Sequence, residues 1–215
     1  LPPGQRHFGT SRSRHPGIHA FGANPKKIFS EGVIKYDVYV NNEEKPSGLY
    51  VVSIKSGNIK RELAMNSGYN NITIYTKKNG KTLSMNITGG EKYALEISQE
   101  ELNEKNTKFA DAVFSNLNTD KTIAGYHCMG NKVVYKDMET AEFYYTPDLL
   151  PPAENLVSMF PGLRGIPLQY EIKSNNTLTF KFVATLIDNM VIDSKIFNAP
   201  ADYKIVTRAE LEKLK

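Results

Sequence analysis

The sequence has a single cysteine, Cys128, among its 215 residues. It therefore cannot form an internal disulfide and offers no multi-cysteine metal site, which excludes a small secreted scaffold held together by disulfides. No run of eighteen apolar residues occurs, so the sequence contains no candidate transmembrane helix. Hydrophobic residues still make up 40% of the chain, which is enough to bury one substantial core.

Recognised catalytic motifs are also missing. The sequence has no Gly-x-Ser-x-Gly elbow, no His-Glu-x-x-His helix, no phosphate-binding loop and no dinucleotide fingerprint. His127 and Cys128 are neighbours in an expected strand, so their side chains point to opposite faces and cannot form a nucleophile–base pair. We therefore expect no enzymatic activity, no cofactor and no functional metal site.

The positive charge of the chain is concentrated at its beginning. Residues 1–27 contain five lysines and arginines and no acid, whereas the net charge of the whole chain is only +4. This stretch is rich in proline, glycine and histidine and poor in large apolar residues, so we expect a disordered basic tail or processing remnant there. Residues 28–215 are expected to form a single domain. Because the surplus charge lies in the tail, the sequence disfavours a nucleic-acid partner.

Apolar and polar residues alternate along most of the chain after residue 28, which is typical of half-buried strands. In 34–40, apolar side chains occupy every second position, and in 59–65 the alternation is broken by an in-phase arginine, Arg61. Asn79-Gly80 separates two alternating segments and predicts a type I′ hairpin with positive φ at both residues. Further strands are expected at 122–129, 132–136, 141–146, 166–172, 178–186 and 190–196.

Three helices are expected between or after the strands. A capping box at Ser98 and Glu101 predicts a helix over 98–117, with its apolar stripe packed on the sheet. Prolines bound a short helix at 153–160, and Thr207 is the expected N-cap of a helix over 208–215. The pattern predicts a mainly β, α+β fold: a strongly curved antiparallel sheet, an unclosed barrel of about ten or eleven strands, with two or three helices on its concave side.

Flexible and aromatic apolar residues are the candidates for ligand contact, because such side chains adapt to irregular ligands. They are Met65, Met85, Tyr144, Met159, Phe160 and Leu163. Segment 144–168 is interrupted by prolines and carries more apolar area than a solvent-facing loop requires. We expect it to form the movable rim of an apolar cavity. The alternative is that these side chains simply fill the core.

Four segments carry a resemblance to a known family. They are Thr122-Ile-Ala-Gly-Tyr-His-Cys128, Ala141-Glu-Phe-Tyr-Tyr-Thr-Pro-Asp148, Phe160-Pro-Gly-Leu-Arg-Gly-Ile-Pro-Leu168 and Phe197-Asn-Ala-Pro-Ala-Asp-Tyr203. Their order resembles that of a bacterial domain family of unknown function that is common in exported Bacteroidetes proteins. That family is similar to the lipoprotein-carrier superfamily that includes LolA and LolB. The resemblance covers roughly residues 28–206.

The resemblance implies an unclosed barrel with helices in its concavity, a periplasmic or outer-membrane-associated location and a hydrophobic ligand such as a lipid acyl chain. Two functions follow as hypotheses. In the first, the protein is a non-catalytic envelope protein that holds a lipid or other hydrophobic ligand in the concavity of the sheet. In the second, it is a structural or interaction module of the cell envelope, with a solid core and a protein partner.

Overall fold

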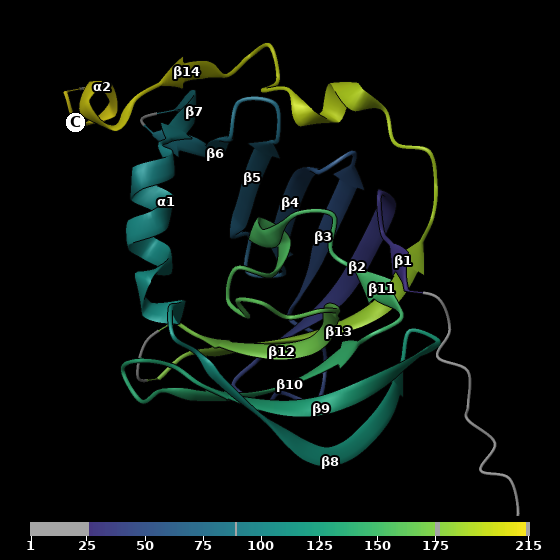
Figure 1. Cartoon of the computed structure of the whole chain (residues 1–215). Coiled ribbons are helices and arrows are strands. Elements are labelled where there is room, and N and C mark those ends of the chain that lie inside the picture. The colour runs from purple at the N-terminus through teal and green to yellow at the C-terminus, as the bar shows by residue number, and fades with distance from the viewer. Residues whose placement is uncertain (1–25, 89, 175–176, 214–215) are drawn as a thin grey trace, which may run out of the picture.

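The computed structural model describes residues 26–88, 90–174 and 177–213, and most of them belong to one large curved sheet (Figure 1). Twelve strands form this sheet in the order β14-β7-β6-β5-β4-β3-β2-β13-β12-β10-β9-β8. The strands are β2 (Glu31–Val40), β3 (Gly48–Lys55), β4 (Asn58–Met65), β5 (Asn70–Thr76), β6 (Lys81–Thr88), β7 (Glu91–Ile97), β8 (Val113–Ile123), β9 (Tyr126–Val134), β10 (Thr140–Thr146), β12 (Ile166–Lys173), β13 (Thr179–Asp188) and β14 (Lys204–Val206).

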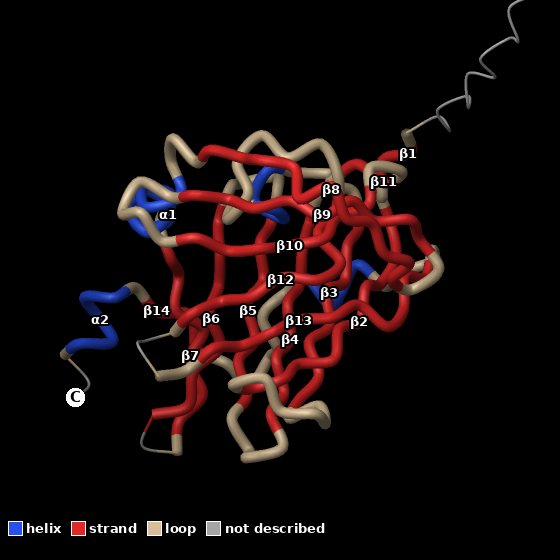
Figure 2. Tube along the Cα trace, turned by 90° about the horizontal axis from the view of Figure 1, so that it is seen from below, coloured by secondary structure: helices blue, strands red, loops and turns tan. Residues whose placement is uncertain are grey.

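The predicted fold class, a mainly β half-barrel that does not close, is confirmed. Figure 2 shows the sheet bending back over itself, with β14 and β8 as its two edges. The sheet is mixed rather than purely antiparallel, because β14 runs parallel to β7. A second, two-stranded parallel sheet joins β1 (Lys27–Ile28) to β11 (Leu149–Leu150), so the first strand begins inside the expected tail. Residues 1–25 of that tail lie outside the described residues.

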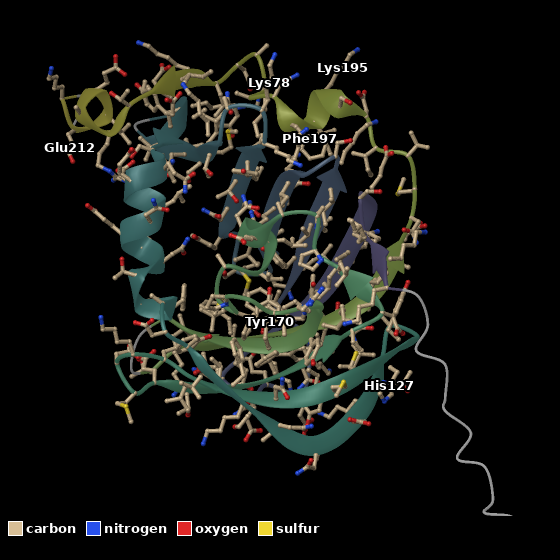
Figure 3. The ribbon with its side chains drawn as sticks, in the orientation of Figure 1. Lys78, His127, Tyr170, Lys195, Phe197 and Glu212 are labelled. Carbon is tan, nitrogen blue, oxygen red and sulfur yellow. The ribbon has the colours of Figure 1, made fainter. Side chains whose placement is uncertain are left out.

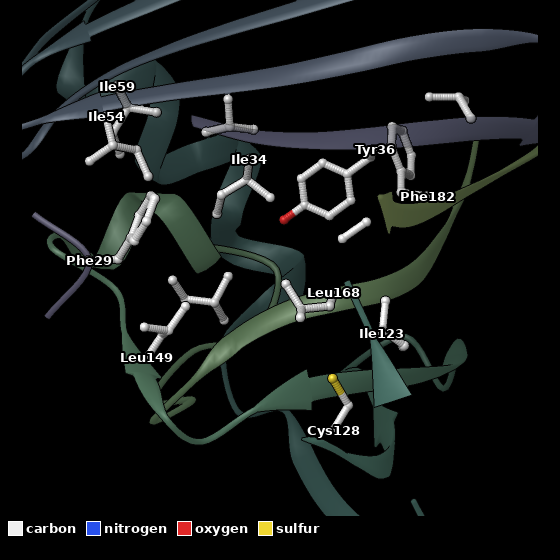
Figure 4. Packing of buried hydrophobic residues seen from close by; sticks show 14 residues of the cluster. Phe29, Ile34, Tyr36, Ile54, Ile59, Ile123, Cys128, Leu149, Leu168 and Phe182 are labelled. Carbon is white, nitrogen blue, oxygen red and sulfur yellow. The ribbon is translucent and has the colours of Figure 1, made fainter. Parts of the chain in front are cut away.

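The main core lies on the concave side of the sheet. Figure 4 shows Phe29, Ile34, Leu149 and Leu168 facing one another from four segments of the chain. All four are buried, and the alternation in β2 and β12 is what places Ile34 and Leu168 on this face. The predicted apolar faces of these two strands are therefore correct.

The convex face of the sheet is covered by residues 190–203. Phe197, in the 3-10 helix η3 (Ser194–Phe197), packs with Ile192 on Ile74 of β5 and Met85 of β6. The strand predicted for 190–196 is wrong. The backbone of Ile192 is hydrogen-bonded by side chains instead of by the backbone of a neighbouring strand. The Ile192 N–H donates to Glu31 (2.9 Å), and its carbonyl accepts from Lys55 Nζ (2.6 Å).

The long helix predicted for 98–117 is much shorter in the structure. α1 (Gln99–Asn106) begins with the expected Ser98–Glu101 capping box, continues as the 3-10 helix η1 (Thr107–Phe109) and gives way to β8. Phe109, Val113 and Leu117 are spaced by four residues, and this spacing places side chains on one face of a strand as well as of a helix. The sequence pattern was ambiguous for that reason, and Val113 is 65% exposed rather than packed on the sheet.

Two smaller corrections concern the turn at Asn79-Gly80 and the proline-bounded helix. β5 and β6 are joined by four residues, 77–80, and of these only Gly80 has a positive φ (66°), so the connection is not a type I′ turn. The helix predicted for 153–160 is a single 3-10 turn, η2 (Glu154–Val157).

Of the helices predicted on the concave side, α1 and the 3-10 turn η2 lie there, whereas α2 (Arg208–Glu212) does not. α1 stands at one side of the concavity, and α2 lies beyond β14 (Figure 1). The capping box at the start of α2, from Thr207 to Glu210, includes the predicted N-cap. Residues 214–215 of the helix predicted there lie outside the described residues.

Replacing Gly80 by valine should destabilise the protein by about 1 kcal/mol or more, because a β-branched side chain resists a positive φ. A Cβ at Gly80 would meet nothing closer than 3.8 Å, so the effect reports backbone strain rather than a clash. Lys78→Val in the same loop, where φ is not positive, is the matched control. Urea denaturation measures both changes, and equal midpoints for the two variants would contradict this account.

Candidate functional site

A cavity of about 1180 Å³ lies on the concave side of the sheet. We call it the concave cavity. Its wall is formed by side chains of β2 to β7 and β12, one side by α1, and its cover by residues 151–163. The wall contains Tyr36, Tyr50, Val52, Arg61, Thr73, Tyr75, Thr82, Ile97, Tyr170 and Ile172. The volume exceeds the roughly 300–1,000 Å³ of a typical small-molecule site.

Residues 151–163, which we call the cover segment, cannot join the sheet because Pro151, Pro152 and Pro161 remove backbone donors. Phe160 fixes this segment in place: it is 2% exposed and its ring lies 4.3 Å from that of Phe143 in β10. The Tyr135 hydroxyl donates to the Met159 carbonyl at 3.0 Å. The cover segment is thus attached to the β9–β10 side of the molecule by packing and by one hydrogen bond.

Two glycines, one in the cover segment and one just beyond its end, have different requirements. Gly162 has a φ of 77°, in the left-handed region that favours glycine. Gly165 lies so close to β10 that a Cβ would come within 2.5 Å of the Thr146 carbonyl oxygen. Gly162 allows the chain to turn, and Gly165 allows it to enter β12 close against β10.

Aromatic rings form the floor of the concave cavity. Tyr170 of β12 stacks on Phe182 of β13 with ring centres 4.9 Å apart, and Tyr50 packs edge-on against Phe182 at 5.2 Å. Tyr170 lies near the middle of the molecule in Figure 3, where the sheet bends beneath the cover segment. Tyr36 packs beside Tyr50 and donates its hydroxyl proton to the Pro167 carbonyl at 3.0 Å.

Burial raises the pKa of Tyr36, Tyr50 and Tyr170 above the ordinary value of a phenol, because a phenolate would lose its hydration. The positive charge of Arg61 acts in the opposite direction at all three hydroxyls. At neutral pH these tyrosines are therefore uncharged, and the floor of the cavity is an aromatic surface with polar tips.

Arg61 introduces a positive charge into this wall. It lies in β4 between Val52 and Thr73 on the concave face, and its Nη2 donates to the Asn155 carbonyl at 2.6 Å. No carboxylate of the described residues lies within ion-pair distance of its guanidinium. The side-chain oxygen of Asn155 is buried and has no hydrogen-bond partner among the described residues.

The structure separates the six residues that the sequence analysis selected. Met159, Phe160 and Leu163 line the concave cavity. Met85 lies on the opposite face of the sheet, where a second cavity of about 540 Å³ runs beneath residues 195–203. Met65 is half-buried at the edge of the main core, and Tyr144 lies under Lys121, whose Nζ is 4.0 Å from its ring centre. Neither lines the concave cavity or this second cavity.

The expected rim is also shorter than 144–168. Tyr144 belongs to β10, Leu149 and Leu150 form β11, and Ile166 and Leu168 belong to β12, so the cover segment is the main part of 144–168 outside the strands. Sequence reasoning did not select Arg61, Tyr50 and Tyr170 as site residues. The signal at Arg61 was its position in phase with the apolar residues of β4.

His127 and Cys128 lie as expected, on opposite faces of β9. Cys128 is buried, and burial raises its pKa to about 11, so its thiol is a poor nucleophile. His127, labelled in Figure 3, is exposed. Its Nε2 lies 3.1 Å from the Asp120 carboxylate. Among the described residues no cluster of three or more His, Cys, Asp or Glu side chains could hold a metal ion. Neither described helix has the length and apolar character needed to cross a membrane.

Stability should fall as the pH rises above about 10. Burial raises the pKa of Tyr135 from 10.0 to about 12, so its neutral form stabilises the fold fully below pH 10 and this contribution is lost between pH 10 and 12. The cavity tyrosines act in the same direction. Urea denaturation at pH 8, 10 and 11 should show a smaller alkaline loss for Tyr135→Phe than for the wild type. Tyr69→Phe, at an exposed tyrosine, should follow the wild type, and equal losses in all three proteins would contradict the prediction.

Comparison with known proteins gives structural likenesses only. No family model and no curated protein matches the sequence. The fold is similar to that of MucB in its complex with MucA from Pseudomonas aeruginosa, with 12% identity, a TM-score of 0.45, and coverage of 83% of this chain and 59% of that one. The chain therefore spans less than two thirds of the MucB chain.

Two further structures are similar over most of their length. One is an uncharacterized conserved protein from Thermus thermophilus, with 11% identity, a TM-score of 0.49, and coverage of 84% of this chain and 93% of that one. The other is the lipoprotein LppX from Mycobacterium tuberculosis, with 9% identity, a TM-score of 0.39, and coverage of 76% and 89%. At these identities and TM-scores the likenesses identify neither a family nor an activity.

Proposed function

We propose that this protein is a non-catalytic binding protein of the bacterial cell envelope that holds a lipid or other hydrophobic ligand in the concave cavity. The observation that carries the proposal is the cavity itself: about 1180 Å³ between an aromatic floor and a cover segment that lies outside the sheet ladder. The envelope location rests on the family resemblance of the sequence.

The chemistry of the lining favours binding over catalysis. The described residues around the concave cavity include no histidine or cysteine, and Arg61, Lys105 and Glu154 are their only charged side chains. The described lining therefore holds no nucleophile–base pair built on a histidine or a cysteine. Each methylene of an acyl chain that leaves water for the cavity contributes about 0.8 kcal/mol, which is sufficient for useful affinity without a covalent step.

A second candidate function, protein interaction, is favoured by the open edge of β8. This strand of eleven residues pairs only with β9 in the described sheet, and Val113 at its start is 65% exposed. An extended segment of another protein can add to such an edge through backbone hydrogen bonds. Strand addition needs no cavity. Filling the cavity should therefore impair lipid binding but leave an interaction at the β8 edge unchanged.

The binding proposal predicts that Thr73→Trp weakens the binding of a fluorescent fatty-acid probe by about tenfold or more, or about 1.4 kcal/mol. Thr73 lies on the wall of the concave cavity, and an indole there occupies the space that the acyl chain needs. Thr122→Trp, at an exposed position of β8, is the matched control and should bind like the wild type.

Fluorescence titration of the purified proteins measures the Kd, and circular dichroism confirms that each variant is folded. If the folded wild type shows no saturable binding, or if Thr73→Trp binds as tightly as Thr122→Trp, the cavity does not hold an acyl chain. The open edge of β8 would then be the better explanation of the protein's function.

A further inference from the structure

We propose that the ligand of the concave cavity is an acidic amphiphile, a single-chain lipid whose anionic head group binds Arg61 while its chain lies on the aromatic floor. This inference rests on the proposed binding function and specifies its ligand class. The volume of the cavity does not say which head group the ligand carries. The charge on the cavity wall does.

The guanidinium of Arg61 has donors to spare. It presents five N–H donors, of which one is engaged by the Asn155 carbonyl at 2.6 Å and another is directed to the Tyr50 hydroxyl. A carboxylate or phosphate can therefore take further donors of the planar fork without displacing the cover segment.

Arg61 is half-buried on the concave face, where it has no acidic partner among the described residues. Four other charged side chains of the central strands β2 to β4 form ion pairs on the opposite, convex face: Lys60 with Glu62 at 2.8 Å and Lys55 with Glu31 at 3.0 Å. Arg61 points instead toward an aromatic wall and has no carboxylate partner among the described residues. A cation held among apolar groups gains more from an anion than an exposed cation does, because water screens it less.

The rest of the lining is consistent with an anionic head group. The lining contains two cations, Arg61 and Lys105, and one anion, Glu154, which leaves an excess of one positive charge. The side-chain amide of Asn155, next to the carbonyl that Arg61 contacts, has an unpartnered buried oxygen.

The chain of the ligand has a continuous path from this point. Arg61 lies beside Val52 in the register of β3 and β4, and the Tyr50 and Tyr170 rings follow on the same concave face. Met159 and Leu163 line the opposite side from the cover segment. An acyl chain between these two surfaces contacts apolar side chains on both sides.

The test is displacement of the fluorescent fatty-acid probe by four unlabelled sixteen-carbon amphiphiles: palmitate, hexadecyl phosphate, hexadecanol and hexadecyltrimethylammonium. We expect at least one of the two anions to bind about tenfold or more tightly than hexadecanol, and the cation to bind more weakly than hexadecanol. The anion that binds more tightly identifies the head group as carboxylate or phosphate.

Arg61→Gln should remove this preference while leaving hexadecanol binding within about twofold of the wild type, and Arg61→Lys should restore part of it. Retained hexadecanol binding also shows that the cavity of each variant is intact. Arg164→Gln, which removes an exposed arginine just beyond the cover segment, is the matched control and should keep the preference.

The outcomes separate the two proposals. If hexadecanol binds wild type as tightly as both anions, or if Arg61→Gln weakens all four amphiphiles equally, the acidic-amphiphile proposal is overturned while the hydrophobic cavity stands. If the folded wild type binds neither the probe nor any of the four amphiphiles, both proposals are overturned.

Discussion

A row of aromatic rings across the bend of the sheet determines how the rest of the structure is arranged. Phe143 packs on Phe160 at 4.3 Å, Phe160 on Tyr170 at 6.0 Å, and Tyr170 on Phe182 at 4.9 Å. The row joins the core beneath β9 and β10 to the main core. A sheet that does not close must cover its concave face with another part of the chain, and here the cover segment does so. Phe160, as a member of the aromatic row, holds that segment in position.

The two faces of the sheet meet this requirement in different ways. Residues 190–203 lie against the convex face, where Ile192 and Phe197 are buried among strand side chains. On the concave face the cover segment packs firmly near β10, whereas toward β4 it is held by the hydrogen bond between Asn155 and Arg61. The volume between these two attachments is the concave cavity. The attachment through Arg61 is also the point where the cavity wall carries a positive charge without an acidic partner among the described residues.

Much of the sheet could be predicted from the sequence, because a period of two residues is a direct consequence of strand geometry. The concave faces of β2 and β12 followed from it. The helix over 98–117 could not be predicted correctly, since a four-residue spacing suits both helix and strand. The site was only partly accessible for a different reason: Met159 and Met85 look alike in sequence, and only the path of residues 190–203 decides that Met85 faces a different cavity. Arg61 stood out by its phase, but its lack of an acidic partner among the described residues is a property of the folded chain.

The edge strand β8 carries an irregularity that limits what can associate with it. Asn118 has a φ of 54°, and the register against β9 shifts between Asn116 and Asp120, where Thr119 packs over Gly130. This bulge divides the edge into two short ladders that cannot both pair with one straight strand. The molecule therefore exposes a long edge that offers a partner strand only one short ladder at a time, which disfavours open-ended strand stacking.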